Sequence, residues 1–77
     1  MPDKKAKIDY YEKQFGIIAI EKGFITSENL VEALKTQIEE ELEYKIHRLI
    51  GEILMEKDFI TPDQIREVLD VIFSTGY

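Results

Sequence analysis

An internal repeat of 35 residues is the strongest constraint on what this chain can fold into. Residues 15–37 read FGIIAIEKGFITSENLVEALKTQ and residues 50–72 read IGEILMEKDFITPDQIREVLDVI, with nine identities in 23 aligned positions. The identities include charged as well as apolar residues, so a shared amphipathic pattern does not account for them. Because 77 residues leave room for one domain, we predict a single domain made of one unit that occurs twice.

Each unit is predicted to form a helix, a tight turn and a second helix. In the second unit, apolar residues recur at the helical spacing i, i+3, i+4, i+7 and i+8, which gives the face Ile65, Val68, Leu69, Ile72 and Phe73. The same face of the first unit contains one polar member and consists of Leu30, Ala33, Leu34, Gln37 and Ile38. We expect the core to use four residues of these faces, namely Leu30, Leu34, Ile65 and Leu69.

The second helix of each unit has a clear start signal. Its N-cap is a threonine, Thr26 or Thr61, whose hydroxyl can accept a hydrogen bond from a free backbone amide of the first turn. Asn29 and Gln64 lie three residues later, at the capping-box position. Pro62 fits the first helical position, because its missing N–H costs nothing there. The second helices are therefore predicted to begin directly after these threonines.

The first helix of each unit is less sharply bounded. We expect one over about residues 9–22, ended by Gly23 in the left-handed conformation, and one over about residues 46–57. Asp58 replaces that glycine in the second unit, where the same conformation has some steric cost. The predicted fold class is all-α: a four-helix domain made of two repeated helix-turn-helix hairpins with approximate internal twofold symmetry.

The domain is predicted to span residues 9–74, with repeat one at about 9–42, repeat two at about 46–74, and a flexible basic tail at residues 1–8. The join between the repeats contains no Gly or Pro, so two arrangements are open. We expect a compact domain with a loop near residues 43–45. In the alternative, the helices on both sides fuse into one rod and two chains exchange units.

The charge balance argues against nucleic-acid binding. Sixteen acidic and ten basic residues give a net charge of −6, whereas affinity for a phosphate backbone needs a positive field. The segments that a DNA-reading helix-turn-helix would use, residues 27–38 and 61–72, are both net acidic. We therefore expect no DNA binding, although a small anionic ligand held by local groups stays open.

The chain shows no set of residues typical of an enzyme or a metal site. It has no cysteine, and its single histidine, His47, lies in a charged stretch where a solvated surface role is expected. The acidic residues 39–43 have helical propensity and lack the glycine-centred turn of a hard-cation site. Gly-rich phosphate loops and nucleophile elbows are absent as well. We predict a non-catalytic protein without a cofactor or metal.

Hydropathy favours a location outside the membrane. The longest uninterrupted apolar run, residues 17–20, is far shorter than the roughly 20 residues that a membrane span requires. The lysines near the N-terminus are not followed by the apolar segment of a signal peptide. We therefore expect no membrane insertion and a cytoplasmic location.

Three positions allow either a packing role or a ligand-binding role. Gly16 and Gly51 lie at equivalent places inside predicted helices, where glycine costs about 1 kcal/mol relative to alanine. Either two helices pack closely there, which we expect, or a ligand or partner backbone approaches. Gln37 interrupts an apolar face where its counterpart is Ile72, so it is either a boundary residue or a group directed at a polar ligand.

A protein interface would use solvent-facing positions beside the apolar faces. The candidates are Val31, Val71 and Tyr44, which we expect to belong to an exposed patch of several hundred Å². Because Tyr44 lies at the join of the repeats, a patch there would alternatively close a homodimer.

The pattern FGxxxxEKGFIT–SENLVEALKTQ, followed by LIGEILMEKDFIT–PDQIREVL, resembles the MshEN domain. That domain is the helical N-terminal module of bacterial type II secretion and type IV pilus assembly ATPases, and the resemblance covers about residues 14–72. It implies paired helical hairpins. In some family members these bind cyclic di-GMP through two tandem copies of the motif, and in others they serve as docking modules for secretion or pilus machinery.

The resemblance also implies a set of ligand-binding positions: Gln14, Gly16, Gly23, Leu30, Leu34, Gln37, Arg48, Gly51 and Leu69. The family motif begins with arginine, but Gln14 and Leu49 stand at those two places, with Arg48 one residue early. Asp58 and Ile72 replace a glycine and a glutamine. The missing arginines remove planar donors suited to guanine edges and phosphates. We therefore expect a stand-alone adaptor or regulatory module that binds a protein partner, with cyclic di-GMP binding as the alternative.

Overall fold

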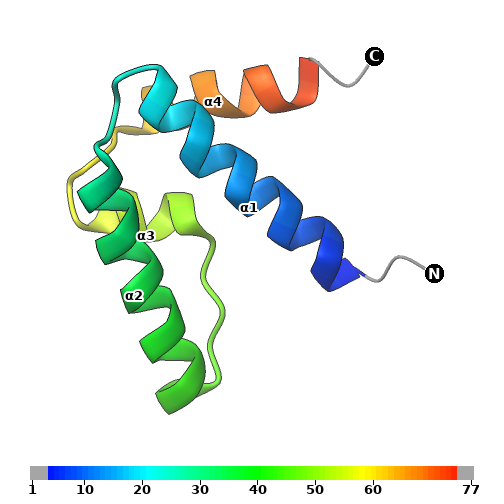
Figure 1. The fold of residues 1–77 in the computed structure, drawn as a ribbon, viewed down its shortest axis with the longest axis vertical. Coiled ribbons are helices and arrows are strands. Elements are labelled where there is room, and N and C mark those ends of the chain that lie inside the picture. The colour runs from blue at the N-terminus through cyan, green and yellow to red at the C-terminus, as the bar shows by residue number, and fades with distance from the viewer. Residues whose placement is uncertain (1–3, 75–77) are drawn as a thin grey trace.

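All four predicted helices are present in the computed structural model of the chain, which describes residues 4–74 and, from Tyr10 onward, their side chains. The helices are α1 (Lys4–Glu21), α2 (Ser27–Tyr44), α3 (Ile50–Glu56) and α4 (Pro62–Ser74) (Figure 1). No strand occurs between residues 4 and 74. The all-α, four-helix fold class is confirmed.

The helix α1 begins earlier than predicted. It starts at Lys4 rather than near Asp9, so residues 4–8, which were expected to belong to the tail, continue the helix. Residues 1–3 of that tail lie outside the described residues. The early start gives α1 a length of 18 residues, whereas its repeat counterpart α3 has seven.

The start of α3 is later than the predicted residue 46. Leu49 is the N-cap and has an extended backbone with φ −70° and ψ 149°. Its N–H donates to Glu52 Oε1 at 2.9 Å, so a first-turn carboxylate satisfies this backbone donor. This local bond fixes the helix start at Ile50.

A loop joins the two units. The helix α2 continues past Gln37 to Tyr44 and ends at Lys45, whose left-handed backbone (φ 57°, ψ 31°) directs its N–H to Glu41 O at 3.2 Å. Residues 45–49 then run back beside α2 to α3 (Figure 1). The compact arrangement is therefore confirmed, and the fused rod is wrong.

The turn inside each unit is built in the same way. Four backbone hydrogen bonds of the first turn have counterparts 35 residues later, all 2.9–3.1 Å long, with donors Lys22, Gly23, Phe24 and Leu30 in the first unit and Lys57, Asp58, Phe59 and Ile65 in the second. Gly23 has φ 78° and Asp58 has φ 64°. The predicted left-handed residue is thus present in both turns, and only the second carries a side chain there.

The predicted caps are also confirmed. Thr26 Oγ1 accepts from Asn29 N–H at 3.1 Å, and Asn29 Oδ1 accepts from Thr26 N–H at 3.0 Å. Thr61 and Gln64 make the same reciprocal pair at 3.2 and 3.0 Å, and α4 begins at Pro62. Both second helices therefore begin where the sequence predicts.

The main packing contacts join helices of different units. The helix α1 packs against α4 and α3, and α2 packs against α3, whereas the two helices of one unit diverge after their turn (Figure 1). Because α1 corresponds to α3 and α4 corresponds to α2 in the repeat, the α1–α4 contact in one direction corresponds to the α3–α2 contact in the other. This is the pairing that a twofold axis requires, and the axis itself stays a prediction that superposing residues 15–37 on residues 50–72 would test.

The core uses different positions of α2 and α4 from those predicted. The buried apolar residues are Phe15, Ala19, Ile25, Ala33, Ile50, Ile53, Leu54, Ile60 and Val68. The equivalent residues Ala33 and Val68 are fully buried, but Leu34 and Leu69, one position later, are 40% and 38% exposed. The expectation that these two leucines supply the core is wrong, because each lies at the edge of its helix's buried face.

Candidate functional site

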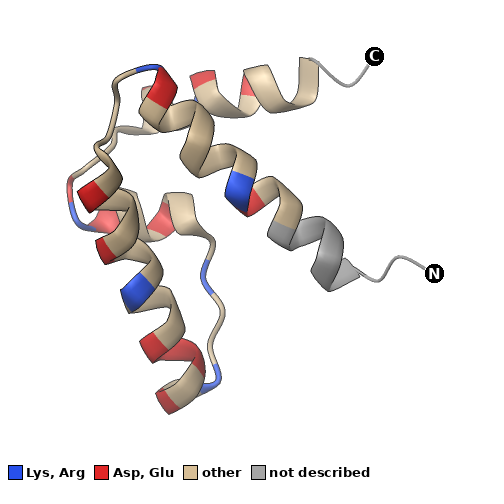
Figure 2. Ribbon diagram, in the orientation of Figure 1, with Lys and Arg blue, Asp and Glu red and all other residues tan. Residues whose placement is uncertain are grey.

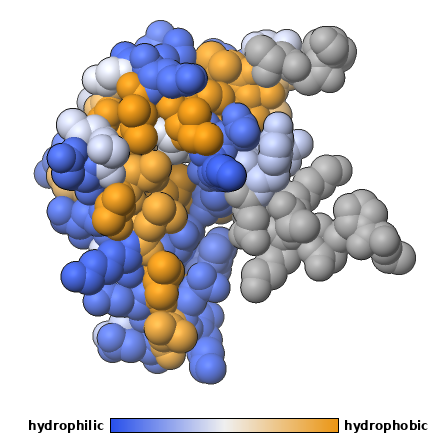
Figure 3. All heavy atoms as spheres, viewed as in Figure 1, coloured by the Kyte–Doolittle hydropathy of each residue, from blue (hydrophilic) through white to orange (hydrophobic). Residues whose placement is uncertain are grey.

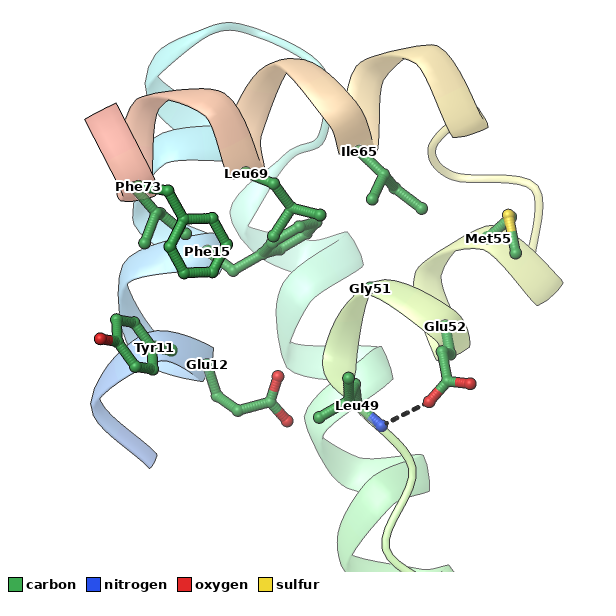
Figure 4. A pocket seen from close by; sticks show the side chains of 11 residues that line it. Tyr11, Glu12, Phe15, Leu49, Gly51, Glu52, Met55, Ile65, Leu69 and Phe73 are labelled. Atoms are coloured by element: carbon green, nitrogen blue, oxygen red, sulfur yellow. Dashed lines mark hydrogen bonds between the residues drawn. The ribbon is translucent and has the colours of Figure 1, made fainter. Parts of the chain in front are cut away.

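The surface has two grooves, one beside the second helix of each unit. The first, which we call the α4 groove, has a volume of about 420 Å³ and lies between α1, α3 and α4 (Figure 4). Its lining is almost entirely apolar and consists of Tyr11, Glu12, Phe15, Leu49, Gly51, Glu52, Met55, Ile65, Leu69, Ile72 and Phe73.

The second groove, the α2 groove, has a volume of about 400 Å³ and a more polar lining. It is lined by Glu12, Lys13, Ile17, Leu30, Leu34, Gln37 and His47. Several of its members are repeat counterparts of the α4 groove lining, as in the pairs Leu30/Ile65, Leu34/Leu69 and Gln37/Ile72. The duplication has therefore produced two related surface sites with different chemistry.

The two sites also differ in which side chains meet at their ends. The ring of Tyr11 on α1 lies 5.9 Å from the ring of Phe73 on α4, although the two residues stay 39% and 63% exposed. The repeat counterparts of these two residues, Ile46 and Ile38, are 50% and 54% exposed. Because α3 starts only at Ile50, no helix extends along α2 as α1 extends along α4.

A polar network separates the grooves. Glu12 on α1 accepts hydrogen bonds from the backbone N–H of Ile50 (3.0 and 3.1 Å to its two oxygens) and from Gln37 Nε2 at 2.8 Å. Gln37 Nε2 also donates to Arg48 O at 2.7 Å. Glu12 therefore satisfies the first amide of α3 from a distant helix and holds Gln37 against the loop.

Ion pairs hold the other side of that loop. Arg48 donates from Nε and Nη2 to the two oxygens of Glu40, at 3.0 and 2.6 Å, and from Nη2 to Glu56 at 2.8 Å. The hydrogen bond from Arg48 lowers the pKa of Glu40, and the bond to Glu40 in turn raises the pKa of Arg48 above its usual range. His47 Nδ1 lies 3.4 Å from Glu41. The single arginine predicted to contact a ligand is thus already paired with two carboxylates.

The nine predicted ligand positions do not meet in one place. Leu30, Leu34 and Gln37 line the α2 groove, whereas Gly51 and Leu69 line the α4 groove. The remaining four line neither groove: Gln14 and Arg48 are half-buried, Gly16 is buried and Gly23 is exposed. The structure therefore divides the set by repeat copy.

The two helical glycines are places of close side-chain packing. A Cβ at Gly16 would lie 2.8 Å from Cδ2 of Leu30, and a Cβ at Gly51 would lie 3.1 Å from Cζ of Phe15. Both are shorter than ordinary contact distances, so side chains of this chain already fill the space. Of the two predicted roles, this favours close packing.

The three predicted interface residues do not form one exposed patch. Val31 and Tyr44 on α2 are 63% and 65% exposed, but Val71 on α4 is half-buried. Since thirteen residues separate Val31 from Tyr44, the helical repeat places them on different sides of α2.

Val31 instead belongs to a row of exposed apolar residues on α2 that the sequence analysis did not predict as an interface. We call this row the α2 stripe: Val31, Leu34, Ile38 and Leu42, which are 63%, 40%, 54% and 74% exposed. The i+4 steps from Leu34 to Leu42 are visible in the sequence, but only the packing shows that they face solvent. Glu12 was missed as well, because its partners lie 25 and 38 residues away.

Within residues 4–74, no three acidic, histidine or cysteine side chains are grouped so that they could hold a metal ion. None of the described helices combines the length and apolarity needed to cross a membrane. No protein-family model, curated protein or solved structure matches the chain.

Proposed function

We propose that this chain is a non-catalytic adaptor or regulatory module that binds a protein partner through exposed apolar surface. The α2 stripe carries the proposal. Four consecutive members of one helical row, all at least 40% exposed, form a contiguous apolar surface of the kind that marks interaction sites. Burying one such aliphatic side chain fully contributes roughly 1.5–3 kcal/mol, so a partner that covers the row gains substantial free energy.

The resemblance to the MshEN domain supplies the biological part of this proposal. On the basis of that resemblance, we propose that the partner is a bacterial secretion or pilus assembly protein, and hydropathy supports an interaction in the cytoplasm. The chain's own contribution is a small scaffold that holds two related grooves and the α2 stripe in a fixed arrangement.

The proposal is tested by site-specific photo-crosslinking in cells. A photoreactive amino acid is placed at position 38 in the α2 stripe, at position 73 in the α4 groove and, as a control, at the exposed position 67. We expect a discrete crosslinked protein at one apolar position and not at the control. The captured protein is identified by mass spectrometry, purified and shown to bind the purified chain. If no position captures a protein beyond the control, the adaptor proposal is wrong.

A second candidate is binding of cyclic di-GMP, favoured by one observation. Three positions implied by the resemblance, Leu30, Leu34 and Gln37, line the same groove beside Lys13. Binding there would require Gln37 to exchange its bonds to Glu12 and to the loop for bonds to the nucleotide.

Titration of cyclic di-GMP, followed by amide chemical shifts, tests this candidate. We expect the shifts to concentrate at the α2 groove and the Gln14→Arg variant to bind more tightly, because a charge-assisted hydrogen bond contributes roughly 1.5–3 kcal/mol. An absence of shifts in both proteins at millimolar nucleotide would exclude it.

A further inference from the structure

We infer that the partner presents an amphipathic helix with basic flanks, which lies along the α2 stripe. This inference rests on the proposed function and adds the chemistry of the partner and the place where it docks. It follows from the geometry of the stripe, the charges beside it and the groove that it borders.

The stripe has the geometry of one half of a helix–helix seam. Its members follow one another at spacings of three, four and four residues, which keeps them on one side of α2. At a rise of about 1.5 Å per residue, the row from Val31 to Leu42 is roughly 16 Å long. Figure 3 shows apolar atoms gathered in a band that follows α2 down this face of the molecule. A single helix of three turns or more can therefore cover the whole row.

Acidic residues run parallel to the stripe. Glu28, Glu32, Glu39 and Glu43 follow one another at spacings of four, seven and four residues, so they form a second row beside the apolar one. All four are exposed, and among the side chains of residues 10–74 only Glu32 of this row has a cationic partner, Lys57 Nζ at 3.5 Å.

The other charges on α2 leave this row acidic. Lys35, the one basic residue of the helix, lies on the same flank, three residues after Glu32 and four before Glu39, so this flank carries four carboxylates and one ammonium group. Glu41 lies exposed on the opposite flank of the stripe, 3.4 Å from His47 Nδ1. Figure 2 shows the predominance of acidic residues along α2. A helix seated on the stripe would place its flanking side chains against these carboxylates, and lysine or arginine there would be favoured while acidic residues would be repelled.

The same charges disfavour a second copy of this chain as the occupant. In an antiparallel pair of identical helices related by a twofold axis, equivalent flanks adjoin each other. The row with Glu28 and Glu43 would then face its own copy, and the net charge of −6 on each chain would add to the repulsion. Charge complementarity therefore selects a basic partner.

The stripe continues into the α2 groove. Leu34 belongs to both, and next to it the groove offers Leu30 and Ile17 as further apolar lining. A large apolar side chain of the docked helix could enter at this point and anchor the seam, as helix-in-groove complexes commonly do.

Two synthetic peptides as long as α2, 18 residues, test the inference. They share one leucine seam at helical spacing, and one carries lysine and the other glutamate on both flanks. A scrambled lysine peptide controls for simple charge attraction. Binding to the full chain is measured by fluorescence anisotropy at about 50 and 300 mM NaCl, and the site is located by amide chemical shifts.

We expect the lysine peptide to bind at least roughly tenfold more tightly than the glutamate and scrambled peptides at low salt, with less preference at high salt. Its shifts should concentrate on α2. The Ile38→Gln/Leu42→Gln variant should weaken binding at least roughly tenfold. Met55→Gln, which changes a 41% exposed residue in the α4 groove, should leave it unchanged. Circular dichroism confirms that each variant folds.

Charge reversal provides the decisive comparison. The Glu39→Lys/Glu43→Lys variant should bind the lysine peptide less tightly than the parent and the glutamate peptide more tightly. Equal binding of both peptides to parent and variant, or shifts centred on the α4 groove, would overturn the inference. A crosslinked protein at position 73 but not at position 38 would also overturn it while leaving the adaptor function intact, whereas no capture at either position removes both.

Discussion

Replacing Glu12 with alanine tests whether the polar network between the grooves holds the two units together. The carboxylate accepts from the buried Ile50 N–H and from Gln37 Nε2, and its side chain is only 15% exposed, so water replaces it poorly. The substitution leaves Ile50 N–H without an acceptor and removes one of the two acceptors of Gln37 Nε2, which keeps only Arg48 O. A buried donor without a partner costs roughly 1–3 kcal/mol, so we expect a loss of about 2–4 kcal/mol in the free energy of unfolding.

That loss is large for a domain of this size. At roughly 0.05–0.15 kcal/mol per residue, a domain this small has a total stability of about 4–12 kcal/mol. The conservative variant Glu12→Gln keeps one oxygen that can accept from Ile50 N–H, so we expect it to lose only about 1–2 kcal/mol. The free energy of unfolding should therefore decrease in the order parent, Glu12→Gln, Glu12→Ala, and the differences measure the contribution of these hydrogen bonds.

Urea unfolding followed by circular dichroism measures the three stabilities, and amide hydrogen exchange at Ile50 reports the bond itself. The matched control is Glu39→Ala, an exposed glutamate on α2, which should change the stability by no more than about 0.5 kcal/mol. If Glu12→Ala loses no more than this control, or if the exchange of the Ile50 amide is unchanged, the network does not contribute as argued.

Three further predictions concern the turns, the loop and the core. Gly23→Ala should lose roughly 1–2 kcal/mol because of its left-handed φ, while Asp58→Gly at the equivalent place should gain stability, both measured by urea unfolding. Arg48 lowers the folded-state pKa of Glu40, so this pair should stabilise the fold fully above the unfolded pKa of about 4.3. That contribution should be lost as the pH falls through the lower folded pKa. In unfolding curves recorded across this pH range, Glu40→Gln should abolish this part of the acid sensitivity. Ile53→Ala, at a fully buried position, should lose about 2–5 kcal/mol in the same measurement, and a smaller loss than that of an exposed alanine variant would contradict its place in the core.

The repeat in the sequence predicts equivalent positions in the two units, but it does not predict how the two grooves differ. The repeat predicts equivalent sites, and the pairs Leu30/Ile65 and Leu34/Leu69 do line equivalent grooves. The ends of the two grooves differ because α1 extends along α4, whereas α3 begins only at Ile50 and does not extend along α2 in the same way. That difference depends on a few residues outside the aligned segments, so the repeat pattern does not contain it.

The sequence by itself determined where α2 and α4 begin and how the turns before them close. Thr26 and Asn29, like Thr61 and Gln64, bond to each other across three residues, and Gly23 closes its turn through its own φ. Such interactions form within one helical turn and depend little on the rest of the chain.

Only the tertiary structure decided which apolar residues are buried and which are exposed. Ala33 and Leu34 are both apolar neighbours on α2, yet the first is fully buried and the second is 40% exposed. The rotation of α2 that separates them is set by its packing against α3 and by the bond between Gln37 and Glu12, 25 residues apart in the chain. A one-residue difference on a helix changes direction by about 100°, so the exposure of Leu34 and Ile38, on which the proposed function rests, follows from contacts between distant segments.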